Sequence, residues 1–155
     1  MGRQNIGGVV LVTYPIDGSD LSSSPTNKVE ATSCKHAYLA EANFGLKSTD
    51  TPVAGSWFLH RANGNETIQS FSVGCMDTGS SASITFDLKK NGASVLSGLV
   101  TVANTDPDRT TKAGTVSSVS LTNDDVLTVV IATSSTTGMQ GPFAQCAIIA
   151  AASPN

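Results

Sequence analysis

From Val53 onward, apolar residues alternate with polar ones at every second position, and turn-forming residues interrupt this pattern about every ten residues. A period of two is typical of a strand with one buried face, because successive side chains of a strand point to opposite faces. The pattern therefore predicts a chain of short antiparallel strands. Its clearest apolar faces are Phe71, Val73 and Cys75, then Ile84, Phe86 and Leu88, and then Leu127, Val129 and Ile131.

The dipeptide Asn91-Gly92 is the strongest hairpin signal in the sequence. A type I′ turn requires positive φ at both of its central residues, and Asn and Gly tolerate that conformation. We therefore predict a structural turn at these two residues. The last apolar run, residues 143–151, is apolar on both faces and predicts a central strand.

The strand pattern predicts an all-β fold, with about eight strands in an antiparallel β-sandwich of the jelly-roll-like kind. We assign this domain to residues 53–155. Residues 1–52 contain too few apolar residues for a core of their own, and we expect them to form an extended N-terminal arm with a strand and loops. Within this arm, residues 29–44 fit either a helical turn or a strand, because they mix Ala and Glu with larger apolar residues.

Charged residues make up 14% of the chain, against a typical share of about 25%. The net charge of −3 and the scattered basic residues give no reason to expect nucleic acid as a partner. No apolar run is long enough for a membrane-spanning helix, so we expect no membrane partner, and we also expect no signal peptide. Cys34, Cys75 and Cys146 are too widely spaced for a disulfide framework. Cys75 and Cys146 fall in strand patterns, which predicts small core residues, but spacing alone does not say whether they touch.

The sequence contains no recognisable catalytic or phosphate-binding motif, since GxSxG, GxGxxG and GxxxxGK are all absent. His60 alternates with strand residues, and Cys34 and His36 lack the further ligands that a zinc site needs. We therefore expect no enzyme activity, no cofactor and no metal. Acidic residues cluster in two loops, where turn formation explains them better than calcium binding. These residues are Asp106, Asp108, Asp124 and Asp125.

The stretch ITFDLKKNGASVL, residues 84–96, resembles a pattern of tailed-bacteriophage virion proteins, in which a strand of the form I-T-x-D-x-x-K-N-G turns on Asn-Gly. Further matches are Ala113-Gly114, the D-x-L-x-V-x-I run that starts at Asp125, the glycine-containing loop of residues 134–142, and the apolar run of residues 146–151. The sequence departs from that pattern at residues 123–125, where Asn-Asp-Asp replaces a common Gly-Asp turn. The resemblance covers about residues 55–151.

This resemblance implies a β-sandwich module of the kind found in head-decoration (cement), head-fibre or tail-tip proteins. The function it most concretely implies is a capsid decoration protein that bridges and stabilises neighbouring major capsid subunits. Such a protein is made in the cytoplasm of the bacterial host, lies on the outer capsid surface of the virion, and associates with itself, most plausibly as a homotrimer. The alternative is a tail or fibre tip that binds a receptor or a carbohydrate, with a glycan as its ligand.

A short apolar stretch in the N-terminal arm gives the candidate partner-binding residues. An extended apolar segment is able to add a strand to the free edge of a neighbouring sheet. We expect the arm to lie across a neighbouring subunit in this way. The residues are Val9, Val10, Leu11, Val12 and Tyr14.

Overall fold

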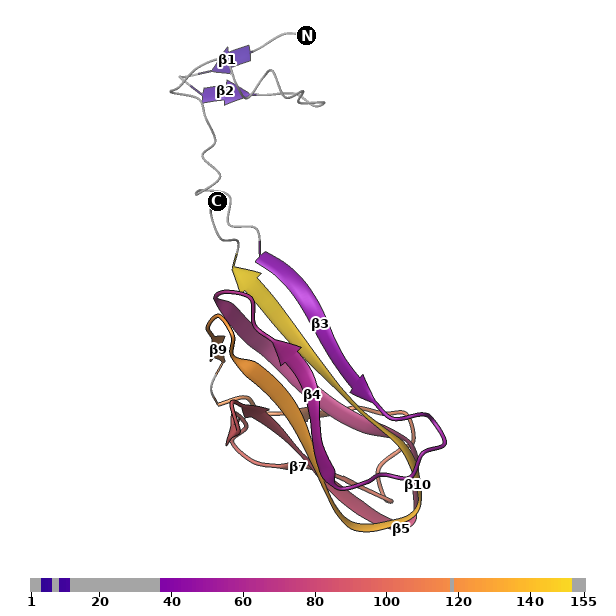
Figure 1. Cartoon of the computed structure of the whole chain (residues 1–155). Helices are drawn as coiled ribbons and strands as arrows, with labels where there is room; N and C mark the ends of the chain where they lie inside the picture. The colour runs from indigo at the N-terminus through magenta and orange to yellow at the C-terminus, as the bar shows by residue number, and fades with distance from the viewer. Residues whose placement is uncertain (1–3, 7–8, 12–36, 118, 152–155) are drawn as a thin grey trace. The chain divides into compact units, whose positions relative to one another are not determined.

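Two long strands, β5 (Glu66–Lys90) and β10 (Val126–Ala151), form the frame of the fold. They pair antiparallel along almost their whole length in the computed structural model, and Figure 1 shows them running side by side. The structure describes the backbone of residues 4–6, 9–11, 37–117 and 119–151, and the side chains of residues 41–117 and 119–150.

Both long strands bend where glycines permit it. Gly79 in β5 and Gly138 in β10 have φ values of 73° and 74°, a conformation that glycine adopts without steric cost. The register between the two strands shifts here, between Thr137 and Met139. The sequence predicted a loop at residues 134–142, which include Gly138, but the backbone stays paired on either side of the bend.

Six shorter strands flank the two halves of this ribbon. They are β3 (Ala37–Gly45), β4 (Gly55–Arg61), β6 (Ala93–Ser94), β7 (Val100–Ala103), β8 (Lys112–Gly114) and β9 (Ser120–Leu121). The second half of β10 lies between β3 and the first half of β5, which in turn pairs with β8 and β9. The first half of β10 lies between β4 and the second half of β5, which in turn pairs with β6 and β7. The sheet of eight strands therefore folds over on itself into two layers.

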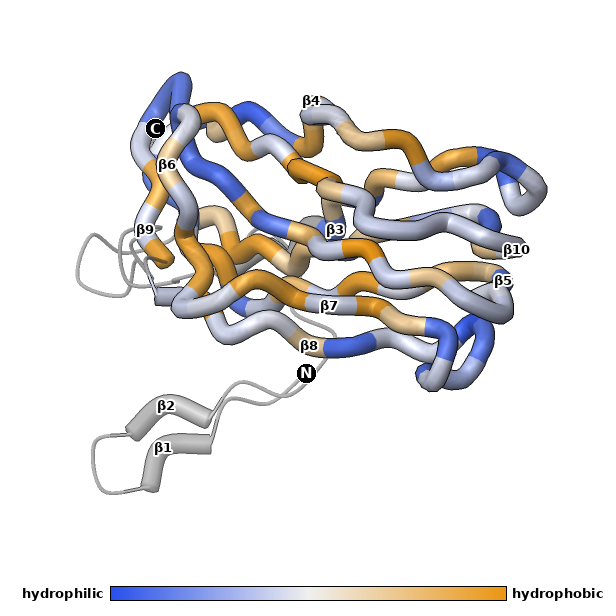
Figure 2. The backbone as a smooth tube through the Cα atoms, turned by 90° about the horizontal axis from the view of Figure 1, so that it is seen from below, coloured by the Kyte–Doolittle hydropathy of each residue, from blue (hydrophilic) through white to orange (hydrophobic). Residues whose placement is uncertain are grey.

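One hydrophobic cluster fills the space between the layers. The three apolar faces predicted from alternation are all buried, with exposed fractions of 0–1% for every member. Figure 2 shows the same alternation along the strands, with hydrophilic stretches in the connecting loops. The predicted all-β, antiparallel fold with eight strands is confirmed, and residues 143–151 form a central strand, as expected.

The strand β3 lies within residues 1–52, which the sequence assigned to the N-terminal arm. It pairs with β10 from Ala37↔Ala151 to Gly45↔Phe143, so the two-layered unit begins before Val53. By backbone contacts this unit extends over His36–Ser153. The sequence was ambiguous here because Ala and Glu are helix formers, whereas pairing with the central strand decides the conformation.

The N-terminal residues belong to a separate unit, Met1–Lys35 together with the last two residues. In it, β1 (Gln4–Ile6) and β2 (Val9–Leu11) form a two-stranded antiparallel sheet. The described residues contain strands and turns but no helix. Accordingly, none of them forms a helix long and apolar enough to cross a membrane.

Candidate assembly surfaces

The Asn91-Gly92 turn ties three segments together at one end of the sandwich. The two residues have φ values of 49° and 87°, the positive values that a type I′ turn requires. The side-chain Oδ1 of Asn91 accepts a hydrogen bond from the amide of Val126 at 2.9 Å, and its Nδ2 donates to Asp125 at 2.6 Å. The hairpin between β5 and β6 is thereby attached to the start of β10.

Asp125 is the centre of a polar network at this end. Its carboxylate lies 2.8 Å from the ammonium of Lys90 and accepts hydrogen bonds from the amide and hydroxyl of Thr122. The bond from Lys90, followed by that from the Thr122 amide, holds the pKa of Asp125 well below its usual range. Donors of the protein itself thus occupy this carboxylate, which agrees with the structural role predicted for this acidic cluster.

The second acidic cluster holds a loop against the bend of β5. The amide and hydroxyl of Thr78 both donate to Oδ1 of Asp108 at 2.9 Å, and these bonds lower the pKa of Asp108. The amide of Ala103 and the ammonium of Lys112 donate to Asp106, and they lower its pKa in that order of importance. Both carboxylates therefore fix the connection between β7 and β8. The described residues hold no group of three or more potential metal ligands.

Cys75 and Cys146 are buried free thiols. Burial raises the pKa of each to about 12, so both remain protonated at neutral pH. Cys75 lies opposite Pro142 and Cys146 opposite Phe71, so the two are not cross-strand partners. As predicted, they serve as small core residues, while Cys34 lies outside the described residues.

His60 belongs to β4 and lies beside the loop that follows this strand. Its Nε2 is 2.6 Å from one carboxylate oxygen of Glu66. The other carboxylate oxygen of Glu66 accepts a hydrogen bond from the backbone amide of Asn63. These contacts fix the turn between β4 and β5, in line with the ordinary strand role predicted for His60. His36, the other histidine, lies outside the described residues.

Of the candidate partner-binding residues in the arm, Val9, Val10 and Leu11 form β2. Their partners in the sheet are Ile6, Asn5 and Gln4 of β1, in that order. Val12 and Tyr14 lie outside the described residues. The binding role of this stretch therefore stays a prediction.

The outer edge of β4 is a first candidate surface that the sequence did not identify. Within the described part of the chain β4 pairs only with β10, so its other edge is free. Phe58 on this strand is 66% exposed, whereas its neighbour Trp57 packs against Phe44 with ring centroids 5.1 Å apart. Single exposed apolar side chains are common on protein surfaces, so Phe58 alone is weak support for a binding site.

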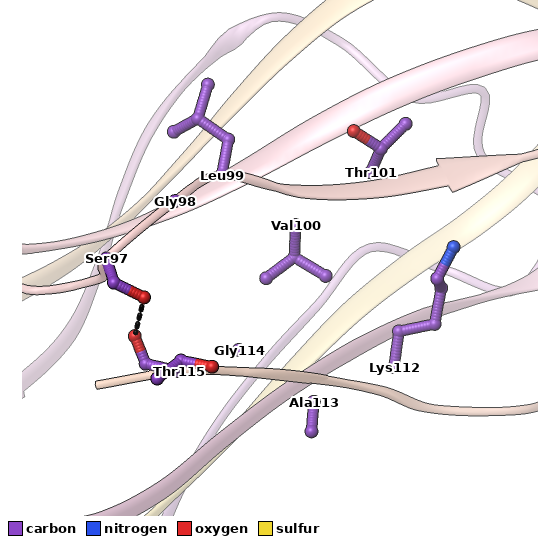
Figure 3. A pocket seen from close by; sticks show the side chains of 9 residues that line it. All are labelled: Ser97, Gly98, Leu99, Val100, Thr101, Lys112, Ala113, Gly114 and Thr115. Carbon is purple, nitrogen blue, oxygen red and sulfur yellow. Dashed lines mark hydrogen bonds between the residues drawn. The ribbon is translucent and has the colours of Figure 1, made fainter. Parts of the chain in front are cut away.

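A groove between β7 and β8 is the second candidate surface (Figure 3). It has a volume of about 450 Å³ and is lined by residues 97–101 on one side and 112–115 on the other. The chain bends at Ser97 and Gly98, between β6 and β7, and this bend opens the groove. The glycine in Ser97-Gly98-Leu99 was the available signal, because an isolated glycine in a strand pattern often marks an irregularity.

The chain shares its fold with a chain described as part of the cyanophage Pam1 capsid asymmetric unit. The two superpose with a TM-score of 0.54 at 12% sequence identity, and the match covers 88% of this chain and 98% of that chain. Searches against protein families and against curated proteins gave no match. At such low identity the similarity establishes the architecture, which here extends over almost the whole of the other chain.

Proposed function

We propose that this chain is a structural protein of a tailed-bacteriophage virion, most concretely a cement protein on the outer surface of the head. The observation that carries the proposal is the shared fold with a chain of a phage capsid asymmetric unit, over 88% of this chain. The motif around Asn91-Gly92 supports the same class independently, through its resemblance to virion proteins.

The order of the strands supports the proposal as well. If the halves of β5 and β10 are counted separately, each layer contains four main strands. One layer has the order β3, second half of β10, first half of β5, β8, and the other has β4, first half of β10, second half of β5, β7. We assign this arrangement to the jelly roll, a double-sheet architecture that viral capsid domains use repeatedly.

In this role the chain binds neighbouring major capsid subunits and stabilises their contacts. Each contact is modest, but binding at one site raises the effective concentration at the next, so several weak contacts hold the protein on the shell. A homotrimer provides three such contacts at once, and light scattering of the purified chain tests this part of the proposal. A mass of one protomer at micromolar concentration contradicts the trimer.

A non-catalytic role is part of the proposal. The carboxylates with lowered pKa, Asp106, Asp108 and Asp125, accept hydrogen bonds from their own loops, and the described thiols are buried and protonated. The alternative role, a tail or fibre tip that binds a glycan, has its support in the exposed ring of Phe58. Because that ring lies on a strand and not among clustered loop aromatics, we favour the capsid role. Specific binding on a glycan array would reverse this preference.

Mass spectrometry of separated heads and tails tests the proposed location. The chain is expected in the head fraction of purified particles, at a copy number comparable to that of the major capsid protein. Recovery in the tail fraction contradicts the cement role and supports the receptor-binding alternative. Absence from both fractions contradicts a virion role altogether.

A further inference from the structure

The dipeptide Asn-Gly occurs twice in the sequence, at Asn63-Gly64 and at Asn91-Gly92. Asparagine is a chemically labile residue, and a glycine after it has no side chain to shield the backbone nitrogen that attacks the asparagine amide. The two dipeptides lie in turns of the sandwich unit, the first between β4 and β5 and the second between β5 and β6. Both sites therefore present the same reactive groups, but in different surroundings.

The reaction open to these groups is deamidation through a cyclic imide. The backbone nitrogen of the glycine loses its proton and attacks Cγ of the asparagine, and the bond from Cγ to Nδ2 breaks, so that ammonia leaves. Water then opens the ring at either of its carbonyl groups. One product is aspartate, and the other is isoaspartate, in which the main chain runs through Cβ and Cγ. The net change consumes water, releases ammonia and adds one negative charge to the chain.

At the second site, the side-chain amide is bonded at both of its polar atoms. Oδ1 of Asn91 accepts a hydrogen bond from the amide of Val126 at 2.9 Å, and Nδ2 donates to Asp125 at 2.6 Å. Rotation of this side chain toward the nitrogen of Gly92 must break both bonds. A typical hydrogen bond makes such a release about fivefold less frequent. The folded chain therefore restrains Asn91 from the reaction.

The first site lacks such a restraint. Asn63 is exposed, and neither its side-chain amide nor the backbone amide of Gly64 forms a hydrogen bond with any of the described residues. The backbone amide of Asn63 donates to Oε1 of Glu66 at 3.0 Å, which fixes the turn but leaves the side chain free to rotate. An added Cβ at Gly64 would meet nothing within 4 Å, so water and base have access to the attacking nitrogen.

We propose that Asn63 is a deamidation site of the folded chain and that Asn91, although it precedes a glycine as well, is protected by its bonds to Val126 and Asp125. The reacting groups are the side-chain amide of Asn63 and the backbone nitrogen of Gly64, with water as the co-reactant. The difference between the two sites lies in the folded structure and not in the dipeptide.

Deamidation of Asn63 changes the turn that attaches β4 to the start of β10. The amide of the preceding residue, Ala62, donates to the carbonyl of Asp125 at 2.8 Å, and its carbonyl accepts the amide of Asp124 at 3.0 Å. The new carboxylate forms on the residue whose backbone amide binds the buried carboxylate of Glu66. The isoaspartate product also lengthens the main chain at this point. Conversion therefore adds negative charge and main-chain length where β4 is attached.

Peptide mass spectrometry of the full-length wild-type chain tests the proposal. The chain is incubated folded and, in parallel, unfolded in guanidinium chloride, in the same mildly alkaline buffer, and the modified fraction at each asparagine is followed over time. In the unfolded chain, Asn63 and Asn91 should react at similar rates. In the folded chain, Asn63 should stay within a few-fold of its unfolded rate, and Asn91 should react at least about tenfold more slowly than Asn63. Equal rates at both sites in the folded chain, or a folded Asn63 as slow as Asn91, would overturn the proposal.

A matched pair of variants tests the reason for the protection. Asp125→Ala removes the acceptor of the Asn91 side chain, whereas Asp125→Asn keeps an oxygen at this position, and both variants lose the ion pair with Lys90. With folding verified by circular dichroism, Asn91 should react several-fold faster in Asp125→Ala than in Asp125→Asn, and Asn63 should react equally in both. Equal Asn91 rates in the two folded variants would contradict the protective role of this bond. If a variant does not fold, the comparison of the two sites in the wild-type chain decides the proposal by itself.

Discussion

At the scale of single residues, Asn91 combines a conformational role with a bonding role. Its positive φ allows the hairpin to turn, and its side chain links the hairpin to Val126 and Asp125. Gly92, the other turn residue, makes its contribution through conformation alone, because an added Cβ there would meet nothing within 4 Å. A change in unfolding free energy on substitution of Gly92 therefore measures backbone strain, because the new side chain collides with no other atom.

The variant Gly92→Val is expected to lose about 1–2 kcal/mol of unfolding free energy, because a β-branched residue at positive φ is strained. Urea unfolding followed by circular dichroism measures this loss. The control is Gly98→Val, since Gly98 has equally open surroundings and no positive φ, and it should change stability much less. Equal stability of both variants and wild type would mean that the turn is not strained by a side chain.

Asp125 makes stability depend on pH. Its pKa is lowered in the folded state, so its contribution is fully present above the unfolded-state pKa of about 3.9 and is lost as the pH falls through the lower folded-state value. The folded chain should therefore lose stability from about pH 4 downward. In Asp125→Asn this acid dependence should be shallower and the stability at neutral pH lower. Urea unfolding midpoints across this range measure both effects, and a pH dependence identical to wild type would contradict the role of Asp125.

At the scale of elements, the long strands β5 and β10 owe their continuity to the glycines at their bends. Gly79 has positive φ, and an added Cβ there would collide with the backbone of Thr137, Gly138 and Met139. The bend brings the two halves of each strand into opposite layers, and the core lies between these layers. Close backbone approach at Gly79 is thus a condition for the two-layered architecture.

The variant Gly79→Ala should destabilise the fold by at least about 2 kcal/mol, from strain at positive φ together with backbone displacement. Gly64→Ala is the matched control: Gly64 also has positive φ, at 106°, but nothing lies within 4 Å of an added Cβ. It should cost only about 1 kcal/mol. Thermal unfolding distinguishes the two, and similar losses in both would contradict the close contact at the bend.

Sequence periodicity predicted the core faces of the long strands but not their continuity. Alternation identifies which residues point inward because it depends only on the period of two, and Phe86 and Val129 are buried as expected. Gly79 and Gly138 had the appearance of loop residues, because glycine marks turns and bends alike.

The groove between β7 and β8 was not predicted from the sequence. Its opening depends on where residues 95–97 meet residues 115–117, and this long-range pairing leaves no local signal.

At the scale of the whole molecule, the chain divides into the sandwich unit and a separate N-terminal unit. The sandwich has its own hydrophobic core and most of the pairing between strands. The N-terminal unit contains β2, whose residues are the candidate partner-binding segment. The stability of the sandwich and the proposed attachment to a shell should therefore be separable properties.

Deleting residues 1–15 should leave the unfolding midpoint of the sandwich unchanged within about a degree, because the core residues lie in the other unit. The same deletion should weaken co-sedimentation of the chain with phage shells that lack it, since it removes the strand that is predicted to add to a neighbouring sheet. Unchanged occupancy on shells would remove the binding role from residues 9–12 and Tyr14. A large loss of thermal stability would instead mean that the arm supports the fold.

A cryo-EM map of the native particle would show where on the virion this chain lies. Density is expected for the two-layered unit on the outside of the head, in contact with at least two neighbouring capsid subunits. Density at the tail tip, inside the shell or nowhere on the particle would contradict the claim that this chain is a capsid cement protein.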